Sequence, residues 1–341
     1  MARLVADLPA AIDFHVHMLE KSVFERCAAH SVLSGFGKRT AVDPRAVEFN
    51  RKMMDPAPQI EDMDARGIGA SVVTSGTVIE TTSWAEPREE LALVQRLNDT
   101  IAEWVRAYPG RFVGSFTLPL QDLDVALGEL TRAVDELGLR VVNAPSRVGD
   151  EYLGAPRFRP FWEAVHARDL VVFVHPEGVQ DPWFQQFALW NSLGQSIEEA
   201  KVMASLIYEG TFDAFPGLKI VISHGGGYFP HYMGRMDRNV KMQPQTMKNI
   251  SRKPSEYLRS FFYDTCVYDS TALDTLVRIV GADRIVLGSD YPVGDADPVG
   301  FIAESASLTD DDVRAIVAGN AASLLGLSDP RYTRVPTPGR P

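Results

Sequence analysis

The chain has 341 residues, 45% of them hydrophobic, and a formal net charge of −11 at pH 7. This length suits one large α/β domain or two ordinary ones, with enough apolar residues for a sizeable core. The acidic balance argues against nucleic acid or an anionic membrane surface as the main partner, although a cleft can still be locally positive.

The chain contains two cysteines, Cys27 and Cys266, which lie far apart in the sequence. Neither a disulfide framework nor a cysteine metal motif is therefore expected. The first ten residues lack a long apolar run, and the sequence contains no stretch of 18 apolar residues. We therefore expect no signal peptide, no membrane span and a cytoplasmic location.

Short apolar runs rich in β-branched residues alternate with helical stretches along the chain. The eight runs are 11–18, 69–76, 112–119, 139–145, 170–177, 219–226, 261–267 and 284–292. Three helical stretches span 87–108, 122–137 and 309–325, the last two opening on the capping residues Asp122 and Thr309. The alternation predicts an α/β fold, a (β/α)8 TIM barrel.

Two inserts interrupt this alternation. The first, residues 19–58, follows the first predicted strand, and the second, residues 178–195, follows the fifth and carries Trp183 and Trp190. Inserts at the carboxyl ends of barrel strands lie over the active site. We predict a single domain over residues 1–327 and an extended or disordered tail over 328–341.

Polar residues end several predicted strands. His15 and His17 alternate on the first strand, so their side chains point to the same face. His175, His224 and Asp290 stand where the fifth, sixth and eighth apolar runs stop. Each alone is explained as a core histidine, a surface histidine or a turn residue. Five of them on one rim of a barrel indicate a functional site.

Nitrogen and oxygen ligands without thiolate fit a divalent metal, most readily Zn²⁺, with Mn²⁺ as the alternative. His15, His17, His175 and Asp290 would supply three imidazoles and a carboxylate, and His224 would lie beside them as a general acid or base. Water on such an ion has a pKa near ~7, and Asp290 could share its proton. Spacing alone does not decide which histidine is ligand and which is base.

The motifs as a set resemble the amidohydrolase superfamily, namely amidohydrolase-related family 2 and its aminocarboxymuconate-semialdehyde decarboxylase-like branch. The resemblance rests on His15-Val16-His17, His175-Pro176 and the segments 224–230 and 288–292, with further similarity at 111–114, 215–219 and 319–321. It spans residues 12–327. It implies one zinc or similar ion held by His15, His17, His175 and Asp290, with His224 and Asp290 catalytic.

Two absences refine this resemblance. Residues 139–145 contain no lysine that could be carboxylated to bridge two metals, which favours a mononuclear site. Benzoate-type decarboxylases of the superfamily often carry Glu at the position of His15. Because this chain has His15 there, we expect it to resemble the aminocarboxymuconate-like, hydratase-like and carbon–carbon hydrolase members more than the benzoate-type decarboxylases.

The resemblance implies a small anionic substrate, a carboxylated aromatic compound or a ring-opened dienoic acid, and a homodimeric enzyme. A cationic clamp is then expected, with Arg45 and Arg51, or residues 38–39, as candidates, and Trp190 against a planar substrate. A solvated face and a local lid core are the simpler interpretations of these residues. The predicted reaction is metal-dependent non-oxidative decarboxylation. The alternatives are hydrolysis of a carbon–carbon bond, lactone or amide, hydration at the same site, and a non-enzymic metal-binding scaffold.

Overall fold

The computed structural model describes residues 8–27, 30, 44–75, 82, 84–179 and 181–332, without the side chains of residues 45 and 46. Its main sheet has eight parallel strands in the order β1-β2-β3-β4-β7-β8-β9-β10. They are β1 (Ala11–His17), β2 (Ile68–Thr74), β3 (Phe112–Phe116), β4 (Val141–Ala144), β7 (Val171–Val174), β8 (Lys219–Ile222), β9 (Phe261–Asp264) and β10 (Ile285–Val286). Each predicted run overlaps one of these strands. Seven runs contain their strand completely, and β2 begins one residue before its predicted run of 69–76.

The sheet closes into a barrel where the segment after β10 meets β1. The Phe14 N–H donates to the Leu287 carbonyl at 2.8 Å, and the His17 N–H donates to the Tyr291 carbonyl at 2.9 Å. The last strand was expected to extend over 284–292, but its regular part is two residues long because the chain beyond it pairs with β1 irregularly. The predicted (β/α)8 barrel is confirmed.

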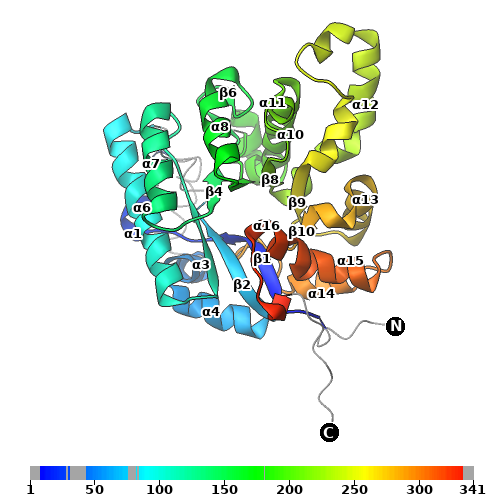
Figure 1. Ribbon diagram of the computed structural model, residues 1–341. Coiled ribbons are helices and arrows are strands. Elements are labelled where there is room, and N and C mark those ends of the chain that lie inside the picture. The colour runs from blue at the N-terminus through cyan, green and yellow to red at the C-terminus, as the bar shows by residue number, and fades with distance from the viewer. Residues whose placement is uncertain are drawn as a thin grey trace.

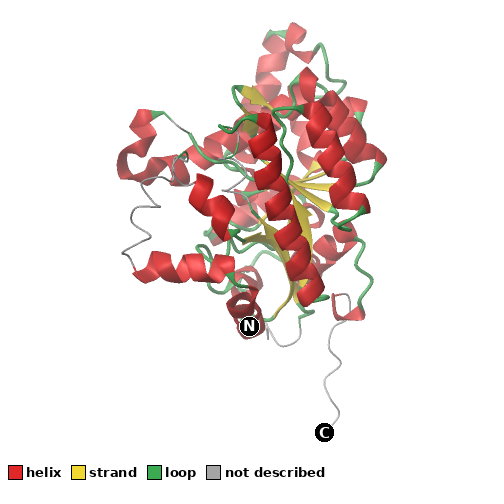
Figure 2. Ribbon diagram, turned by 90° about the vertical axis from the view of Figure 1, so that its left-hand side faces the viewer, coloured by secondary structure: helices red, strands yellow, loops and turns green. Residues whose placement is uncertain are grey.

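Helices surround the barrel (Figure 1), and the strands lie inside this helical layer (Figure 2). The α-helices are α1 (Lys21–Cys27), α3 (Pro44–Met54), α4 (Pro56–Ala65), α6 (Pro87–Ala107), α7 (Leu123–Asp135), α8 (Arg159–Ala167), α9 (Leu189–Ser192), α10 (Gly194–Tyr208), α11 (Thr211–Ala214), α12 (Phe229–Met242), α13 (Ser270–Val280), α14 (Pro298–Ala303), α15 (Asp310–Arg314) and α16 (Asn320–Leu325). None of the helices in these described ranges is long and apolar enough to cross a membrane.

Shorter elements connect these helices and strands. A two-stranded antiparallel ribbon, β5 (Arg147–Val148) and β6 (Glu151–Tyr152), follows β4. The short helical turns are η2 (Pro156–Phe158), η3 (Pro182–Ala188), η4 (His224–Gly226), η5 (Pro244–Met247), η6 (Pro254–Ser260), η7 (Ala282–Arg284), the π-helical η8 (Ala315–Gly319) and η9 (Pro330–Tyr332).

The predicted helix starts at Asp122 and Thr309 are confirmed. The Asp122 carboxylate accepts from the N–H groups of Asp124 and Val125 at 3.1 and 3.2 Å. Thr309 forms a capping box with Asp312, which satisfies two N–H groups that a helix leaves unpaired. The stretch predicted as one helix over 309–325 contains a π-helical turn between α15 and α16.

The two inserts contain more regular structure than their sequences indicate. The first holds α1, α3 and the beginning of α4, and the second holds η3 and α9. In the second insert Trp183 and Phe187 are 56% and 89% exposed. Both inserts follow strands whose carboxyl ends carry the predicted site, as expected.

Part of the predicted tail is ordered against the barrel. Tyr332 is buried, and the Arg331 carbonyl accepts from the Ala10 N–H at 3.0 Å, just before β1. The Arg331 guanidinium also donates to the Gly110 carbonyl at 2.9 Å. Residues 333–341 lie outside the described part. Within the described tail, residues 330–332 therefore pack on the barrel, where an extended arm was expected.

Candidate metal centre

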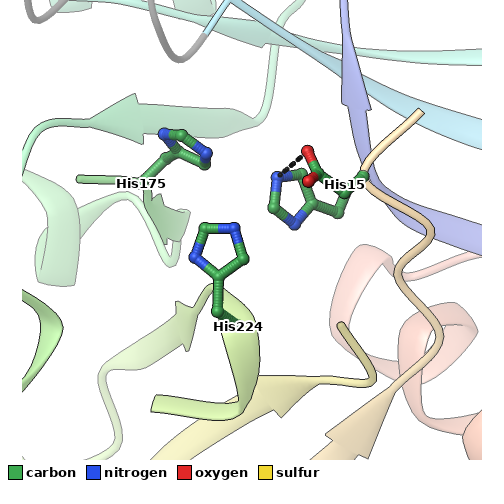
Figure 3. Close-up of side chains that lie close together, drawn as sticks. His15, His175 and His224 are labelled. Carbon is green, nitrogen blue, oxygen red and sulfur yellow. Dashed lines mark ion pairs between the residues drawn. The ribbon is translucent and has the colours of Figure 1, made fainter. Parts of the chain in front are cut away.

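All five predicted site residues lie at the carboxyl ends of the barrel strands. His15 and His17 are on β1, and His175 and His224 follow β7 and β8. Asp290 follows β10. Figure 3 shows the rings of His15, His175 and His224 around a common space, with centroids 5.1 to 5.3 Å apart. The parallel topology thus brings together residues as far apart in the sequence as His15 and Asp290.

The cluster offers enough ligand atoms for one ion. His15, His175, His224 and Asp290 each present one such atom, and these four atoms lie within 4.8 Å of one another. His17 joins them through its Nε2, which is 2.9 Å from Asp290 Oδ1. The same oxygen is 3.4 Å from His15 Nε2. The distances alone therefore leave open whether His17 or His224 completes a ligand set.

Buried nitrogen atoms in the cluster lack hydrogen-bond partners. His15 is fully buried, and its Nε2 has no hydrogen bond, nor does Nδ1 of the buried His17. Leaving a buried polar atom unpaired costs about 1–3 kcal/mol. A bound cation would relieve that cost at His15, whose Nε2 faces the cluster. The donor set of imidazoles and a carboxylate therefore fits a divalent metal.

Burial and charge set the protonation states that such a site needs. Burial lowers the pKa of His17 and lowers that of His175 well below its usual value, so both rings are neutral at neutral pH. Burial alone would raise the pKa of Asp290, but the charges of His15 and His17 and the His17 hydrogen bond hold it well below its ordinary range. Neutral imidazole and ionised carboxylate are the metal-binding forms.

The backbone is strained at two cluster positions. His224 and Asp290 have φ angles of +49° and +57°, a left-handed region that non-glycine residues rarely occupy. Each such conformation costs on the order of 1–3 kcal/mol and persists only where the surroundings impose it. At both positions the strand has just ended, so the turn directs a side chain across the barrel mouth instead of continuing the strand alternation.

Asp264, at the end of β9, fixes the orientation of His15. Its Oδ2 is 2.7 Å from His15 Nδ1, and both residues are fully buried. A carboxylate only accepts, so Nδ1 carries the proton and Nε2 is left to face the cluster. The Oδ1 of Asp264 accepts from the backbone N–H groups of Gly225 and Cys266 at 3.0 and 3.1 Å. Sequence reasoning missed Asp264, although it is the charged residue that interrupts the seventh predicted run, 261–267.

Asp290 is held from two sides. Buried Asp13 accepts from the backbone N–H and the hydroxyl of Ser289, at 3.0 and 2.5 Å, which fixes the residue before Asp290. The Tyr268 hydroxyl donates to Asp290 Oδ2 at 3.2 Å. Neither Asp13 nor Tyr268 was predicted as part of the site. Asp13 lies on the same strand as His15 and His17 at the same alternation, and this spacing was an available signal.

A buried carboxylate contacts His224. Glu199 Oε1, from α10, is 2.5 Å from His224 Nδ1. Burial alone would disfavour the protonated ring, but the charge and hydrogen bond of Glu199 outweigh it and raise the pKa of His224 to about 9. The protonated form of His224 is therefore favoured at neutral pH, whereas burial favours the neutral rings of His17 and His175.

The predicted substrate residues lie in the two inserts. Arg51, in α3, is half exposed and donates to both carboxylate oxygens of Glu48 at 2.7 and 2.9 Å. The side chain of Arg45, together with residues 38–39, lies outside the described part. Trp190, in α9, packs against Gly178, three residues after His175, where an added Cβ would stand 2.3 Å from the Trp190 carbonyl oxygen.

Histidines and a carboxylate at the carboxyl ends of the strands thus place a metal-type donor set where (β/α)8 barrel proteins carry their functional sites. The profile of the amidohydrolase family matches residues 12–327. The chain belongs to this family, as its motifs predicted.

Two relatives cover most of the chain. It is 30% identical over 340 residues to a 2-amino-3-carboxymuconate-6-semialdehyde decarboxylase of Dictyostelium discoideum, covering 94% of this chain and 93% of that protein. It is 31% identical over 284 residues to a gamma-resorcylate decarboxylase of Polaromonas sp., covering 78% and 86%. Both relatives are named as carboxy-lyases, consistent with the predicted branch.

Solved structures show the same fold. A 5-carboxyvanillate decarboxylase from Sphingomonas paucimobilis superposes with a TM-score of 0.83 at 26% identity, covering 93% of this chain and 99% of that one. A dihydroxybenzoic acid decarboxylase from Polaromonas sp., with bound manganese and the inhibitor 2-nitroresorcinol, gives 0.81 at 25% identity, covering 95% and 99%.

Proposed function

We propose that this protein is a metal-dependent non-oxidative decarboxylase of a carboxylated aromatic compound or a ring-opened dienoic acid. One observation carries the proposal. Four imidazoles and one carboxylate converge at the carboxyl ends of the barrel strands, in a chain whose relatives of similar length are named decarboxylases. We assign His15, His17, His175 and Asp290 as ligands of one divalent ion, and His224 and Asp290 as catalytic residues.

Charge supports the choice of His17 rather than His224 as a ligand. The rings of His17 and His175 are neutral and can each give a lone pair to a cation. His224 is held by Glu199 in its protonated form, which has no lone pair to give. A bound divalent cation would lower the pKa of His224 by repulsion, toward neutral pH, where an acid catalyst works best.

We propose Zn²⁺ as the ion, with Mn²⁺ as the alternative, because imidazole and carboxylate donors suit both. When bound, the ion supplies Lewis acidity that stabilises negative charge developing on the substrate. A related decarboxylase binds manganese, which supports a divalent metal without favouring zinc.

The chain's own residues supply the proton transfer. In the proposed step, the bond between the substrate carbon and its carboxylate breaks, its electron pair stays on the carbon and CO₂ leaves. The proton from His224 Nε2 then adds to that carbon, so charge and atoms balance. The negative charge of Asp290 favours the protonated form of His224 and thereby helps to keep the proton available.

The two inserts would bind the substrate. We propose Arg51 and Arg45 as partners of the substrate carboxylate, and Trp190 as a surface for its planar part. The position of the first insert after β1 supports the choice of the two arginines. The packing of Trp190 against Gly178, three residues after His175, supports the choice of Trp190. On the family resemblance alone, we also propose a homodimer. From the low cysteine content and the lack of any stretch of 18 apolar residues in the sequence, we propose a cytoplasmic location.

The test is a screen of the metal-loaded protein against carboxylated aromatic acids and ring-cleavage dienoic acids, with CO₂ and product measured together. Decarboxylation predicts one CO₂ for each substrate consumed and a product that lacks the carboxylate. Products that have gained water without releasing CO₂ would contradict it and favour the hydrolase or hydratase alternative. The His224→Asn variant controls for uncatalysed release.

A further inference from the structure

The pair formed by Glu199 and His224 lies beside the proposed ligands but is not part of them. Glu199 is completely buried in α10. Its Oε1 is 2.5 Å from His224 Nδ1 and also accepts from the Ser223 hydroxyl at 2.9 Å. Ser223 and His224, at the end of β8, therefore both donate a hydrogen bond to the same carboxylate oxygen. A carboxylate buried in this way, with a histidine as its charged partner, is costly unless the pair has a fixed geometry.

The glycine turn after His224 allows α10 to come this close. Gly227 has a φ of +59°, and a Cβ at this position would lie 2.8 Å from Glu199 Oε2 and 2.6 Å from the Ser196 carbonyl oxygen. A side chain at residue 227 would therefore push α10 away from the turn. The Gly225-Gly226-Gly227 run thus does more than reverse the chain, because it keeps a buried carboxylate within hydrogen-bond distance of His224.

The geometry also fixes which nitrogen of His224 faces the cluster. Because Nδ1 donates to Glu199, Nε2 points to the space shared with His15 and His175, as Figure 3 shows for the rings. Without Glu199, the ring could rotate about its side-chain bonds or adopt the other tautomer. Either change would remove the proton from the position where the substrate carbon must receive it.

We propose that Glu199 is a positioning residue, which orients His224 from α10 so that its Nε2 faces the substrate. This inference rests on the proposed function for its consequence in catalysis. Its structural part, the hydrogen bond from His224 Nδ1 to Glu199, holds for any reaction at this site.

The experiment compares Glu199→Gln with Glu198→Gln. Glu198 is the adjacent residue of α10 and is also buried, but its carboxylate contacts Tyr152 and Lys201 at 2.9 to 3.1 Å. The two variants therefore make the same change of charge in the same helix. We expect Glu199→Gln to lower kcat by about 10- to 100-fold with KM and metal content nearly unchanged. Glu198→Gln should keep kcat within about twofold of the wild type.

A second readout does not depend on activity or metal. In metal-free protein labelled with ¹⁵N-histidine, the His224 Nδ1–H proton should give a far-downfield NMR signal, assigned by its absence in His224→Asn. The signal should persist in Glu198→Gln and move upfield or vanish in Glu199→Gln. Glu199→Asp, which keeps the charge on a shorter side chain, should restore part of kcat. If Glu199→Gln fails to fold, the NMR comparison is made on Glu199→Asp, whose shorter side chain should move the signal upfield; an unchanged signal there would equally overturn the positioning role.

The outcomes separate the inference from the proposed function. An unchanged NMR signal in Glu199→Gln, or a kcat equal to that of Glu198→Gln, would overturn the positioning role. A lost signal in a protein that releases CO₂ from no substrate would leave the positioning role supported and the decarboxylase proposal refuted.

Discussion

At the scale of single residues, the histidines of the candidate centre differ in their hydrogen-bond partners and in their protonation. His15 donates to Asp264 and His224 donates to Glu199, while the rings of His17 and His175 lose protons through burial. In the proposed function, histidine would thus provide both the metal ligands and the proton donor, from rings whose centroids are about 5 Å apart. Burial and the carboxylates of neighbouring elements, rather than the histidines themselves, thus determine which rings are neutral and which carry a proton to donate.

The clearest residue-scale prediction concerns Asp264. Replacing it by Asn keeps the shape but removes the negative charge that fixes the His15 Nδ1 proton. We expect Asp264→Asn to weaken metal binding by about 10- to 100-fold, measured by titrating metal-free protein against a competing chelator. The control is Asp269→Asn, five residues along, where the side chain caps α13 and Asn serves equally well. Equal affinities in the two variants would refute the assigned role.

At the scale of elements, secondary structure was easiest to predict from the sequence where a strand is buried on both faces of the sheet. The parallel strands β4 and β7 are buried throughout, so they form continuous apolar runs that a sequence reader can find. The helices of the first insert were harder to predict, since Met53 is the one buried residue among those of α3 whose side chains are described, and the helix lacks a long apolar stripe. Helical stability there depends on packing that periodicity does not reveal.

An element-scale prediction concerns Glu90, in the first turn of α6. A carboxylate is usually favourable at a helix N-terminus, but burial here outweighs that effect and raises the pKa of Glu90 to about 7. The folded state therefore holds a proton that the unfolded state releases between roughly pH 4.3 and 7. With respect to Glu90, the free energy of unfolding is therefore highest below about pH 4.3, where the group is protonated in both states. It decreases as the pH rises toward 7.

The Glu90→Gln variant removes this titration. We expect it to unfold with a free energy higher than that of the wild type by on the order of 1 kcal/mol at pH 8, and with a smaller advantage at pH 5. Urea unfolding at the two pH values measures the difference. A gap between variant and wild type that stays the same at both pH values would show that the ionisation of Glu90 does not couple to folding.

At the scale of the whole molecule, the strands and the rim residues could be predicted because both follow local patterns. His15, His17, His175, His224 and Asp290 each interrupt an apolar run, and the barrel topology then places them at one mouth. Glu199 could not be predicted, because it lies within a helix and meets His224 only through tertiary packing of α10 on the glycine turn. The positions of the candidate substrate residues could not be predicted either, because they depend on how the inserts fold, which the hydrophobic periodicity of the sequence does not indicate.

The most direct test of the central claim is the metal content of the purified protein, measured by mass spectrometry for the wild type and for His15→Ala/His17→Ala. A mononuclear centre predicts about one zinc or manganese ion per chain in the wild type and almost none in the variant. Circular dichroism confirms that the variant is folded. A wild-type protein that retains no ion after reconstitution with divalent metals, or a folded variant that binds as much as the wild type, would contradict the claim.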